Sequence, residues 1–542
     1  MMFAGLVTLA LAFPPQSAPA ERLFEGLGNH HRAVTTTSPL AQKYFDQGVA
    51  LMNGFNHGEA VKSFKYATTL DPNCAMAYWG IAVADGPNIN YPIVDPDRAK
   101  EATESLAKAR SLEPSLQPVE RALIDAATKR YIFPQPDDRS TLDKAYADAM
   151  RDVWHSFPND PDVGVLFAES LMDLRPWDLW SLDGQPRDIT PEVETTLETV
   201  LKMDPNHPQA LHLYIHTMEA SPTPGRALAA ADKLRNLQPG LGHMVHMPSH
   251  IDIRTGNWAK AEVANEKAIS TDNAYRRLNS NPGLYRMYMT HNHQMLAFAA
   301  TMRGEGQRAI KEMDAGAGII PSDFGKGNAP FVDGYMAMPI EVRKRFGRWD
   351  EILAMPEFPD YFPAARAMRH ADRAIAYAAL GDTAKARAEA SQFEEGAKGI
   401  PADYPFGNNH AVNILATARH LMEGELLLAD NKLDDSIAQL RQAVDAEDQL
   451  AYNEPPDWMQ PTRHTLGAVL LKVGKFQEAA AVYEKDLQVH PNNGWALFGL
   501  SKAYEGLGQK DKAKKAAAQF HTAWKDADLQ LTSSCLCVKS VP

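Results

Sequence analysis

A period of 34 residues near the C-terminal end constrains the fold of this chain more than any other feature. Gly474 and Gly508 are separated by this period, and so are Ala479 and Ala513. Periods of this length are typical of arrays of two-helix units, in which each unit packs only on its neighbours. Small residues at fixed places let the two helices of a unit cross closely. The period therefore predicts a solenoid of antiparallel helix pairs.

The residues around this period resemble the tetratricopeptide repeat, as in Leu466-Gly467, Gly474-Lys475-Phe476 and Tyr483. Weaker copies of the same pattern are anchored at Gly48, Gly256 and Gly381, among others. We therefore expect an all-α fold over residues 21–525, built from about nine to eleven helical hairpins in a right-handed superhelix.

Four stretches do not fit the repeat, and all are rich in Gly, Pro, Asp and aromatic residues. They are residues 85–97, 174–190, 318–340 and 396–410. Insertions in a solenoid become loops on one face, which is often the binding face. The alternative is simple divergence between repeats. We expect these stretches to be irregular loops.

The N-terminal end has the composition of an export signal. Residues 1–20 carry no charge, and Ala18-Pro19-Ala20 has the small-x-small form of a cleavage site. We expect a signal peptide at residues 1–20 and a secreted or periplasmic protein. Without a genuine signal the protein would be cytoplasmic. No later segment is apolar enough to predict a membrane span.

Charge and cysteine content exclude several other classes. The net charge of −13 disfavours a nucleic-acid partner, because binding the phosphate backbone needs excess Lys and Arg. Three cysteines cannot form a disulfide framework in a chain of 542 residues. Cys535 and Cys537 form Cys-x-Cys in a tail, residues 526–542, that we expect to be flexible. The pair could form a strained disulfide or bind a soft ion.

The most informative chemical feature is a cluster of histidines between residues 207 and 293, which holds eight of the chain's 18. Within it, two trios have spacings that place each trio on one face of a helix. The first trio is His212, His216 and Glu219, and the second is His243, His246 and His250.

The repeat frame places both trios on the wall of the concave groove. First helices of neighbouring repeats lie about 8–10 Å apart. We therefore expect His212 to face His246, and His216 to face His250. Pro248 interrupts the second helix, so His246 could instead lie in a turn before it.

Imidazoles and a carboxylate that converge in this way are typical ligands of a transition metal, here zinc or copper. The predicted ligands are His216, His246, His250 and Glu219, with His212 and His243 as further ligands or supporting partners. Glu219 could alternatively be a catalytic general base. His291 is the nearest additional candidate.

Other residues gave weaker predictions. His57 takes a position where an aromatic ring normally packs, which favours a core histidine. His464 should face the groove but far from His250 along the solenoid. Trp177 and Trp458 either line a pocket or pack between irregular repeats. The chain contains no phosphate-binding loop, nucleophile elbow or His-Glu-x-x-His motif.

Two long segments make a more specific resemblance possible, residues 214–221 (YIHTMEAS) and 242–251 (GHMVHMPSHI). With Phe55-Asn56-His57-Gly58-Glu59-Ala60 and Met76-Ala77-Tyr78-Trp79-Gly80, they resemble an uncharacterised family of tetratricopeptide-repeat proteins, mainly bacterial and often exported. This resemblance implies a specialised groove with histidines on its wall, and it leaves open whether the groove catalyses a reaction.

Two classes of function fit these observations. The first is a metal-dependent enzyme acting on a small molecule, a hydrolase if the ion is zinc and an oxidoreductase if it is copper. The alternative is a non-catalytic protein, either a scaffold that binds a peptide or protein in its groove or a metal-storage protein. Mostly neutral histidines are poorly suited to hold peptide carboxylates, so the groove composition favours a metal.

Overall fold

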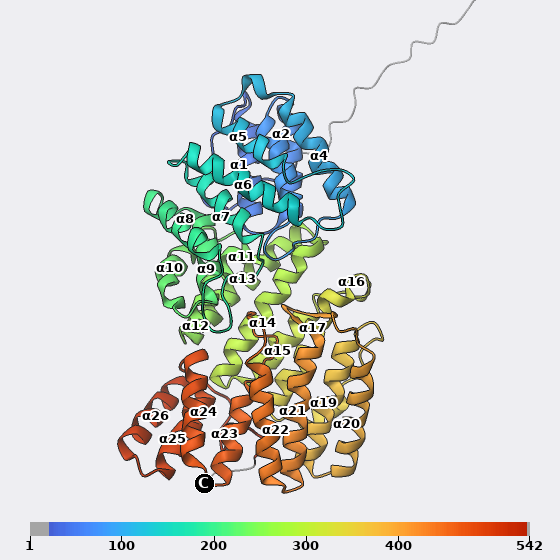
Figure 1. Ribbon diagram of the computed structural model, residues 1–542, viewed down its shortest axis with the longest axis vertical. Helices are drawn as coiled ribbons and strands as arrows, with labels where there is room; N and C mark the ends of the chain where they lie inside the picture. Colours follow the sequence, from blue (N-terminus) through green and yellow to red (C-terminus); the bar gives the residue numbers. More distant parts are fainter. Residues whose placement is uncertain (1–20, 539–542) are drawn as a thin grey trace, which may run out of the picture.

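The computed structural model describes residues 21–538, and the signal peptide expected at residues 1–20 lies outside the described residues. The described chain is a long array of helices that runs from α1 at one end to α26 at the other (Figure 1). The expected helical-hairpin solenoid is therefore confirmed. Strand pairing beyond isolated bridges is confined, within residues 21–538, to β1 (Pro405–Phe406) and β2 (Asn409–His410), a short antiparallel hairpin.

The first helices form the N-terminal part of the array. They are α1 (Pro39–Asn53), α2 (His57–Leu70), α3 (Ala75–Ala84), α4 (Pro96–Arg110), α5 (Pro118–Ala127), α6 (Ser140–Ser156), α7 (Pro161–Met172), α8 (Thr190–Met203), α9 (Pro208–Glu219) and α10 (Leu228–Leu234). The central helices are α11 (Gly242–His246), α12 (Pro248–Arg254), α13 (Trp258–Leu278), α14 (Arg286–Arg303), α15 (Gly306–Ala317), α16 (Ser322–Gly327), α17 (Ala329–Arg345) and α18 (Trp349–Ala354).

The C-terminal part has the most regular hairpins. Its helices are α19 (Pro363–Leu380), α20 (Thr383–Lys398), α21 (Ala411–Ala429), α22 (Leu433–Glu447), α23 (Thr462–Lys472), α24 (Phe476–Val489), α25 (Gly494–Gly506) and α26 (Lys510–Ala523). Short 3-10 turns occur at Glu113–Ser115, Pro224–Ala227 and Gly283–Tyr285.

The small residues of the repeat allow neighbouring helices to cross closely, as the period predicts. The fully buried ring of Tyr483 on α24 lies between Gly467 on α23 and Gly499 on α25. A Cβ atom at Gly467 would lie 2.3 Å from Tyr483 Cζ, and one at Gly499 would lie 2.1 Å from it. Three successive helices can pack this closely only because both positions lack a side chain.

The C-terminal helices fold back onto the centre of the molecule. The indole Nε1 of Trp495 on α25 donates to the carbonyl oxygen of Thr301 on α14 at 2.8 Å. Trp258 at the start of α13 donates to the carbonyl oxygen of Pro491 at 2.8 Å. Figure 1 accordingly shows α12 beside the α24–α26 end of the chain. The array therefore closes on itself, and segments distant in sequence share one interior.

Two of the four stretches expected to be irregular loops depart from that prediction. Residues 318–340 are largely helical, because they form α16 and most of α17. Gly334 within α17 faces the ring of Phe406, so this glycine serves close packing and not a turn. Residues 396–410 include the end of α20 and the β1–β2 hairpin. Residues 85–97 and 174–190 are mostly loop, as expected.

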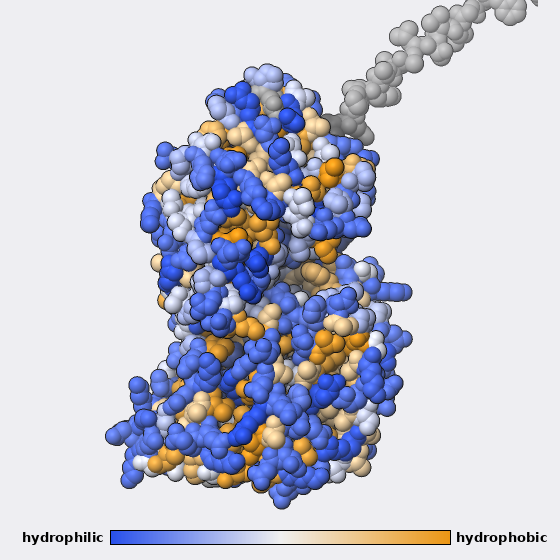
Figure 2. All heavy atoms as spheres, viewed as in Figure 1, coloured by the Kyte–Doolittle hydropathy of each residue, from blue (hydrophilic) through white to orange (hydrophobic). Residues whose placement is uncertain are grey.

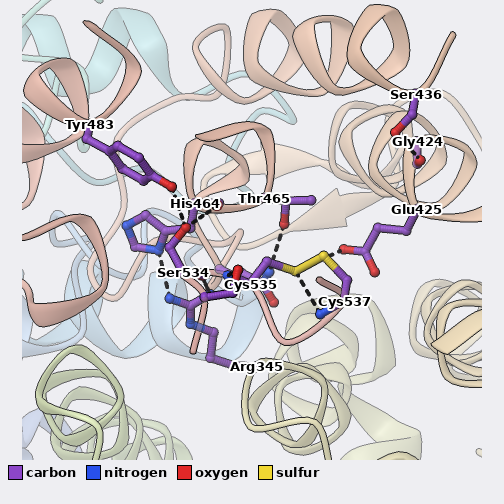
Figure 3. The surroundings of a disulfide bond; sticks show 12 residues. Arg345, Gly424, Glu425, Ser436, His464, Thr465, Tyr483, Ser534, Cys535 and Cys537 are labelled. Carbon is purple, nitrogen blue, oxygen red and sulfur yellow. Dashed lines mark hydrogen bonds between the residues drawn. A yellow bond between two sulfur atoms is a disulfide. The ribbon is translucent and has the colours of Figure 1, made fainter. Parts of the chain in front are cut away.

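The prediction of a flexible C-terminal tail is wrong for residues 529–538. Ser533, Ser534 and Cys535 are buried, and Cys535 and Cys537 form a disulfide (Figure 3). Ser534 Oγ donates to the carbonyl oxygen of His464 at 2.8 Å, and Arg345 donates to the carbonyl oxygen of Ser534 at 3.1 Å. Small side chains let this segment enter the gap between α17 and α23, which a hydrophobic period cannot reveal.

The surface is mainly hydrophilic, with scattered apolar patches and a hollow between the two ends of the array (Figure 2). None of the helices within residues 21–538 combines the length and the apolar character that a bilayer span requires.

Packing around Tyr483 leads to a first prediction. Gly499→Ala should lower the free energy of unfolding by about 1–3 kcal/mol, because the new methyl group overlaps the ring. The gain in helix propensity, about 1 kcal/mol, is too small to offset this overlap. Gly396→Ala on α20 is the matched control, since its Cβ would lie 3.9 Å from that of Ala367. Thermal unfolding should show a lower midpoint for Gly499→Ala alone, and equal midpoints would contradict the packing.

Candidate metal centre

Six histidines from four helices gather at the centre of the molecule. Five of them are buried, and the sixth, on α14, is partly exposed. They are His212 and His216 on α9, His243 and His246 on α11, His250 on α12 and His291 on α14. The sequence-based prediction that both histidine trios lie close together is thus met, with His291 as an added member.

Pro248 decides how the second trio is arranged. It begins α12, and Met247 separates this helix from α11, which ends at His246. Proline has no backbone N–H to continue the preceding helix. The chain therefore turns between His246 and His250, as the sequence suggested it could.

This break changes one predicted pair and keeps the other. His212 faces His243, with their Nε2 atoms 3.0 Å apart, instead of facing His246. His216 faces His250 as predicted, with ring centres 5.6 Å apart. The error arose from treating the second trio as one continuous helix.

The six rings fall into two sets. The first histidine set is His212, His216 and His243, and the second histidine set is His246, His250 and His291. In each set, one ring nitrogen from every histidine lies within 4.8 Å of the other two. His212 Nε2 is 3.1 Å from His216 Nε2 in the first set, and His246 Nε2 is 2.7 Å from His250 Nε2 in the second.

Hydrogen bonds fix the tautomers in the first histidine set. His212 Nδ1 lies 3.0 Å from the carbonyl oxygen of Asn53, which can only accept, so this nitrogen carries a proton. His216 Nδ1 likewise donates to Glu219 Oε1 at 2.9 Å. A neutral imidazole with a proton on Nδ1 has a lone pair on Nε2. His212 Nε2 therefore presents its lone pair to His216 Nε2, a contact that a proton or a metal ion between the rings satisfies.

The second histidine set has the same arrangement. His246 Nδ1 donates to Asn265 Oδ1 at 2.6 Å, and the Nδ2 group of Asn265 donates to the carbonyl oxygen of Ala261 at 2.8 Å. This second bond fixes which end of the amide faces His246. His250 Nδ1 donates to Glu219 Oε2 at 2.6 Å. His246 Nε2 therefore presents a lone pair to His250 Nε2 at 2.7 Å, a contact that a proton or a metal ion between the rings satisfies.

Glu219 joins the two sets. It is buried, and its two carboxylate oxygens accept from His216 in one set and His250 in the other. Burial alone would raise the pKa of this carboxyl, but His216 and His250 lower it to about 2. The geometry favours Glu219 as a support for two ligands, because both of its oxygens already bind Nδ1 groups. This differs from its predicted roles of ligand or general base.

Glu454, a second buried carboxylate, comes from the loop between α22 and α23 and was missed by sequence reasoning. One of its oxygens lies 3.1 Å from His250 Nδ1. Burial raises the pKa of Glu454 to about 7. Burial lowers the pKa of His250, but Glu219 and Glu454 outweigh that effect and raise it to about 10. No repeat or motif marks Glu454, and closure of the array alone brings it here.

Burial keeps four of the imidazoles neutral. It holds the pKa values of His212, His243 and His246 well below their usual range, with neighbouring histidines adding to the effect. Burial and His250 lower the pKa of His291 to about 3. Neutral imidazoles are the form that binds metal ions.

A cavity of about 630 Å³ opens beside the histidines. His216, His243, His250 and His291 lie on its wall. Aromatic and amide side chains form much of the rest, among them Phe55, Trp177, Tyr288, Tyr335, Asn88, Asn90, Asn408 and Asn453. The stretches at 85–97 and 174–190 contribute to this wall, so both lie on the face that carries the cavity.

The weaker candidates are placed as follows. His57 is on the cavity wall, with its ring stacked on Phe55, and not in the core as expected. His464 is buried between Asp486 and Arg345, away from the cavity wall. Trp177 lines the cavity. Trp458 packs under the ammonium group of Lys344.

Comparisons with known proteins agree with the fold. Residues 470–519 match the tetratricopeptide repeat family. The match covers only the repeat near the C-terminal end of the helical-hairpin array. No curated protein sequence matches the chain.

Solved structures show distant likenesses. One is the human IFIT1 dimer with m7Gppp-AAAA, with 14% identity and a TM-score of 0.35 over 91% of this chain and 92% of that one. Another is the APC/C hetero-tetramer Cut9-Hcn1, with 11% identity and a TM-score of 0.31 over 90% of this chain and 74% of that one. Values this low support no statement about ligands.

The fixed tautomers can be measured directly. In protein stripped of metal, His212 and His246 should be neutral with the proton on Nδ1 from about pH 6.5 to about pH 8, because burial holds their pKa values well below the usual range of histidine. Long-range ¹H–¹⁵N correlation spectra of histidine-labelled protein distinguish the tautomers. His212→Gln and His246→Gln variants assign the signals. Protonation of either ring within this range, or a proton on Nε2 alone, would contradict the geometry.

Proposed function

We propose that this protein is a transition-metal-dependent enzyme, with an ion at the first histidine set and a small-molecule substrate in the adjoining cavity. One observation carries the proposal: the Nε2 atoms of His212 and His216 face each other at 3.1 Å, while their Nδ1 protons are held by Asn53 and Glu219. Two unprotonated nitrogens at this distance repel unless a cation lies between them.

The spacing of the nitrogens supports a metal as that cation. Imidazole nitrogens bind zinc at about 2.0–2.1 Å, so two of them on a tetrahedral ion lie about 3.3 Å apart. His212 Nε2 is 3.1 Å from His216 Nε2 and 3.0 Å from His243 Nε2. Three neutral imidazoles are typical of catalytic zinc sites, which keep a fourth position for water or substrate. His216 and His243 lie on the cavity wall, so a molecule in the cavity can reach that position.

The ligand chemistry favours zinc or copper, since both bind imidazole well. Zinc would supply Lewis acidity or a bound hydroxide for hydrolysis, and copper would supply oxidation. The protein itself orients the rings through Asn53, Asn265 and Glu219. The cavity disfavours an anionic substrate, because Arg98 on its wall already pairs with Asp85 at 3.7 Å and Glu454 adds a further carboxylate.

Burial of the histidines argues against the scaffold alternative. Side chains that hold a peptide in a concave groove must be exposed, but His212 and His246 are 0% exposed. A metal-storage protein has no need of a large cavity beside its ions, so the cavity favours an enzyme. Export to the cell exterior or periplasm is part of this proposal, and the Cys535–Cys537 disulfide fits an oxidising compartment.

Metal content tests the site. Protein purified without chelators should contain zinc or copper by plasma mass spectrometry, and His212→Asn/His216→Asn should lose at least half of it. His293→Asn is the matched control, because His293 pairs with Glu312 outside both sets. Circular dichroism checks that each variant keeps its helices. No metal above trace in the wild type, even after incubation with Zn²⁺ or Cu²⁺, would overturn the proposal.

Catalysis needs its own test. The zinc form should hydrolyse at least one member of a panel of uncharged esters and amides, or the copper form should consume oxygen with phenols or aromatic amines. The His212→Asn/His216→Asn variant should lose that turnover. Stable metal binding with no turnover in either form would favour metal storage instead.

A further inference from the structure

We infer that the centre holds two metal ions, with a second ion bound by His246, His250 and His291. This inference rests on the proposed function and deepens it. The first histidine set is already complete with three imidazoles, as many protein ligands as catalytic zinc sites use. The second histidine set repeats the same ligand chemistry with different residues.

The second histidine set has its own geometric support. His246 Nε2 and His250 Nε2 face each other at 2.7 Å, and their Nδ1 protons are held by Asn265 and Glu219. His291 completes the set, with its ring centre 4.7 Å from that of His246. Because Asn265 supports this set alone, the case for a second ion does not depend on Asn53 or His212.

The two sets lie side by side. The rings of His216 and His250 are 5.6 Å apart across the boundary, and those of His243 and His246 are 5.7 Å apart. These separations match the 5.6 Å between His250 and His291 inside the second set. Ions bound to adjacent sets would thus be near neighbours, as in two-metal sites with a spacing of about 3.5–4 Å.

The charge around the second histidine set is compatible with a second ion. Glu219 and Glu454 are both buried beside His250. A buried carboxylate is costly unless a positive charge lies nearby, and a protonated His250 or an ion bound by His250 supplies that charge.

A pair of ions changes which ligands the cavity can take. His216, His243, His250 and His291, two from each set, lie on its wall. Both ions can then contact one molecule, and a ligand with a donor oxygen able to bridge them fits this arrangement. We therefore assign the cavity to an uncharged substrate or small co-substrate that binds both ions through oxygen.

One further cluster, at Asp162, lies outside the two histidine sets and does not compete with them. Asp162, between His30 and His207, also binds Arg32, and His207 Nδ1 accepts from the backbone N–H of Ala210 at the start of α9. That cluster is a structural clamp.

Metal stoichiometry on the full-length protein tests this inference. Stripped wild type, titrated with Zn²⁺ and separately with Cu²⁺, should bind two ions per chain. His246→Asn/His291→Asn should bind one, and so should His212→Asn/His243→Asn. His293→Asn should still bind two. One ion in the wild type and in His246→Asn/His291→Asn would overturn the second ion and leave the proposed function standing, while none in any form would overturn both.

A spectroscopic measurement on the wild type tests the same inference without relying on a variant that must fold. With one equivalent of Cu²⁺ or fewer, electron paramagnetic resonance should detect isolated ions. At two equivalents the integrated signal should fall below the copper content, because ions this close couple magnetically. A signal that equals total copper at two equivalents would show that the ions are far apart, and the inference would fail.

Discussion

The centre of this protein depends on one carboxylate that accepts two imidazole N–H groups. Glu219 lies at the end of α9 and holds His216 from its own helix and His250 from α12. Because each Nδ1 is occupied, each Nε2 turns inward, toward the other rings of its set. A single residue thus sets the orientation of one ring in each histidine set. Asn53 and Asn265 do the same for the partner rings, through a backbone carbonyl and a side-chain amide.

Much of the fold could be predicted from the sequence. Each unit of a helical repeat packs on its neighbours in the chain, so a short stretch of sequence shows how it packs. The glycines around Tyr483 mark where three helices cross, and the 34-residue spacing of Gly474 and Gly508 marks the repeat itself. The close approach of His216 and His250 followed from the same frame. Residues 318–340 were misjudged because their Gly and Pro residues resemble a loop, although Gly334 lies inside α17 to make room for Phe406.

The support of the candidate site could not be predicted in the same way. Glu454 belongs to a loop without a repeat, and closure of the array brings it to His250 across 204 residues of sequence. Asn265 looks like any polar residue of a helix until its two hydrogen bonds are seen. The break at Pro248 was visible, but only the structure shows that it brings His243 to His212. The residue types of the candidate ligands could thus be predicted from the sequence. The residues that hydrogen-bond to these ligands depend on the tertiary fold and could not.

Closure of the array also limits how this chain can change in length. Open solenoids gain and lose repeats readily, because each unit touches only its neighbours. Here Trp495 binds Thr301 and Trp258 binds Pro491, so the segment between these contacts must span a set distance. Adding or deleting one helical hairpin between α15 and α23 would shift α25 relative to α14 by one repeat and break these contacts. Closure therefore fixes the repeat number in this part of the chain, which an ordinary solenoid leaves free to vary.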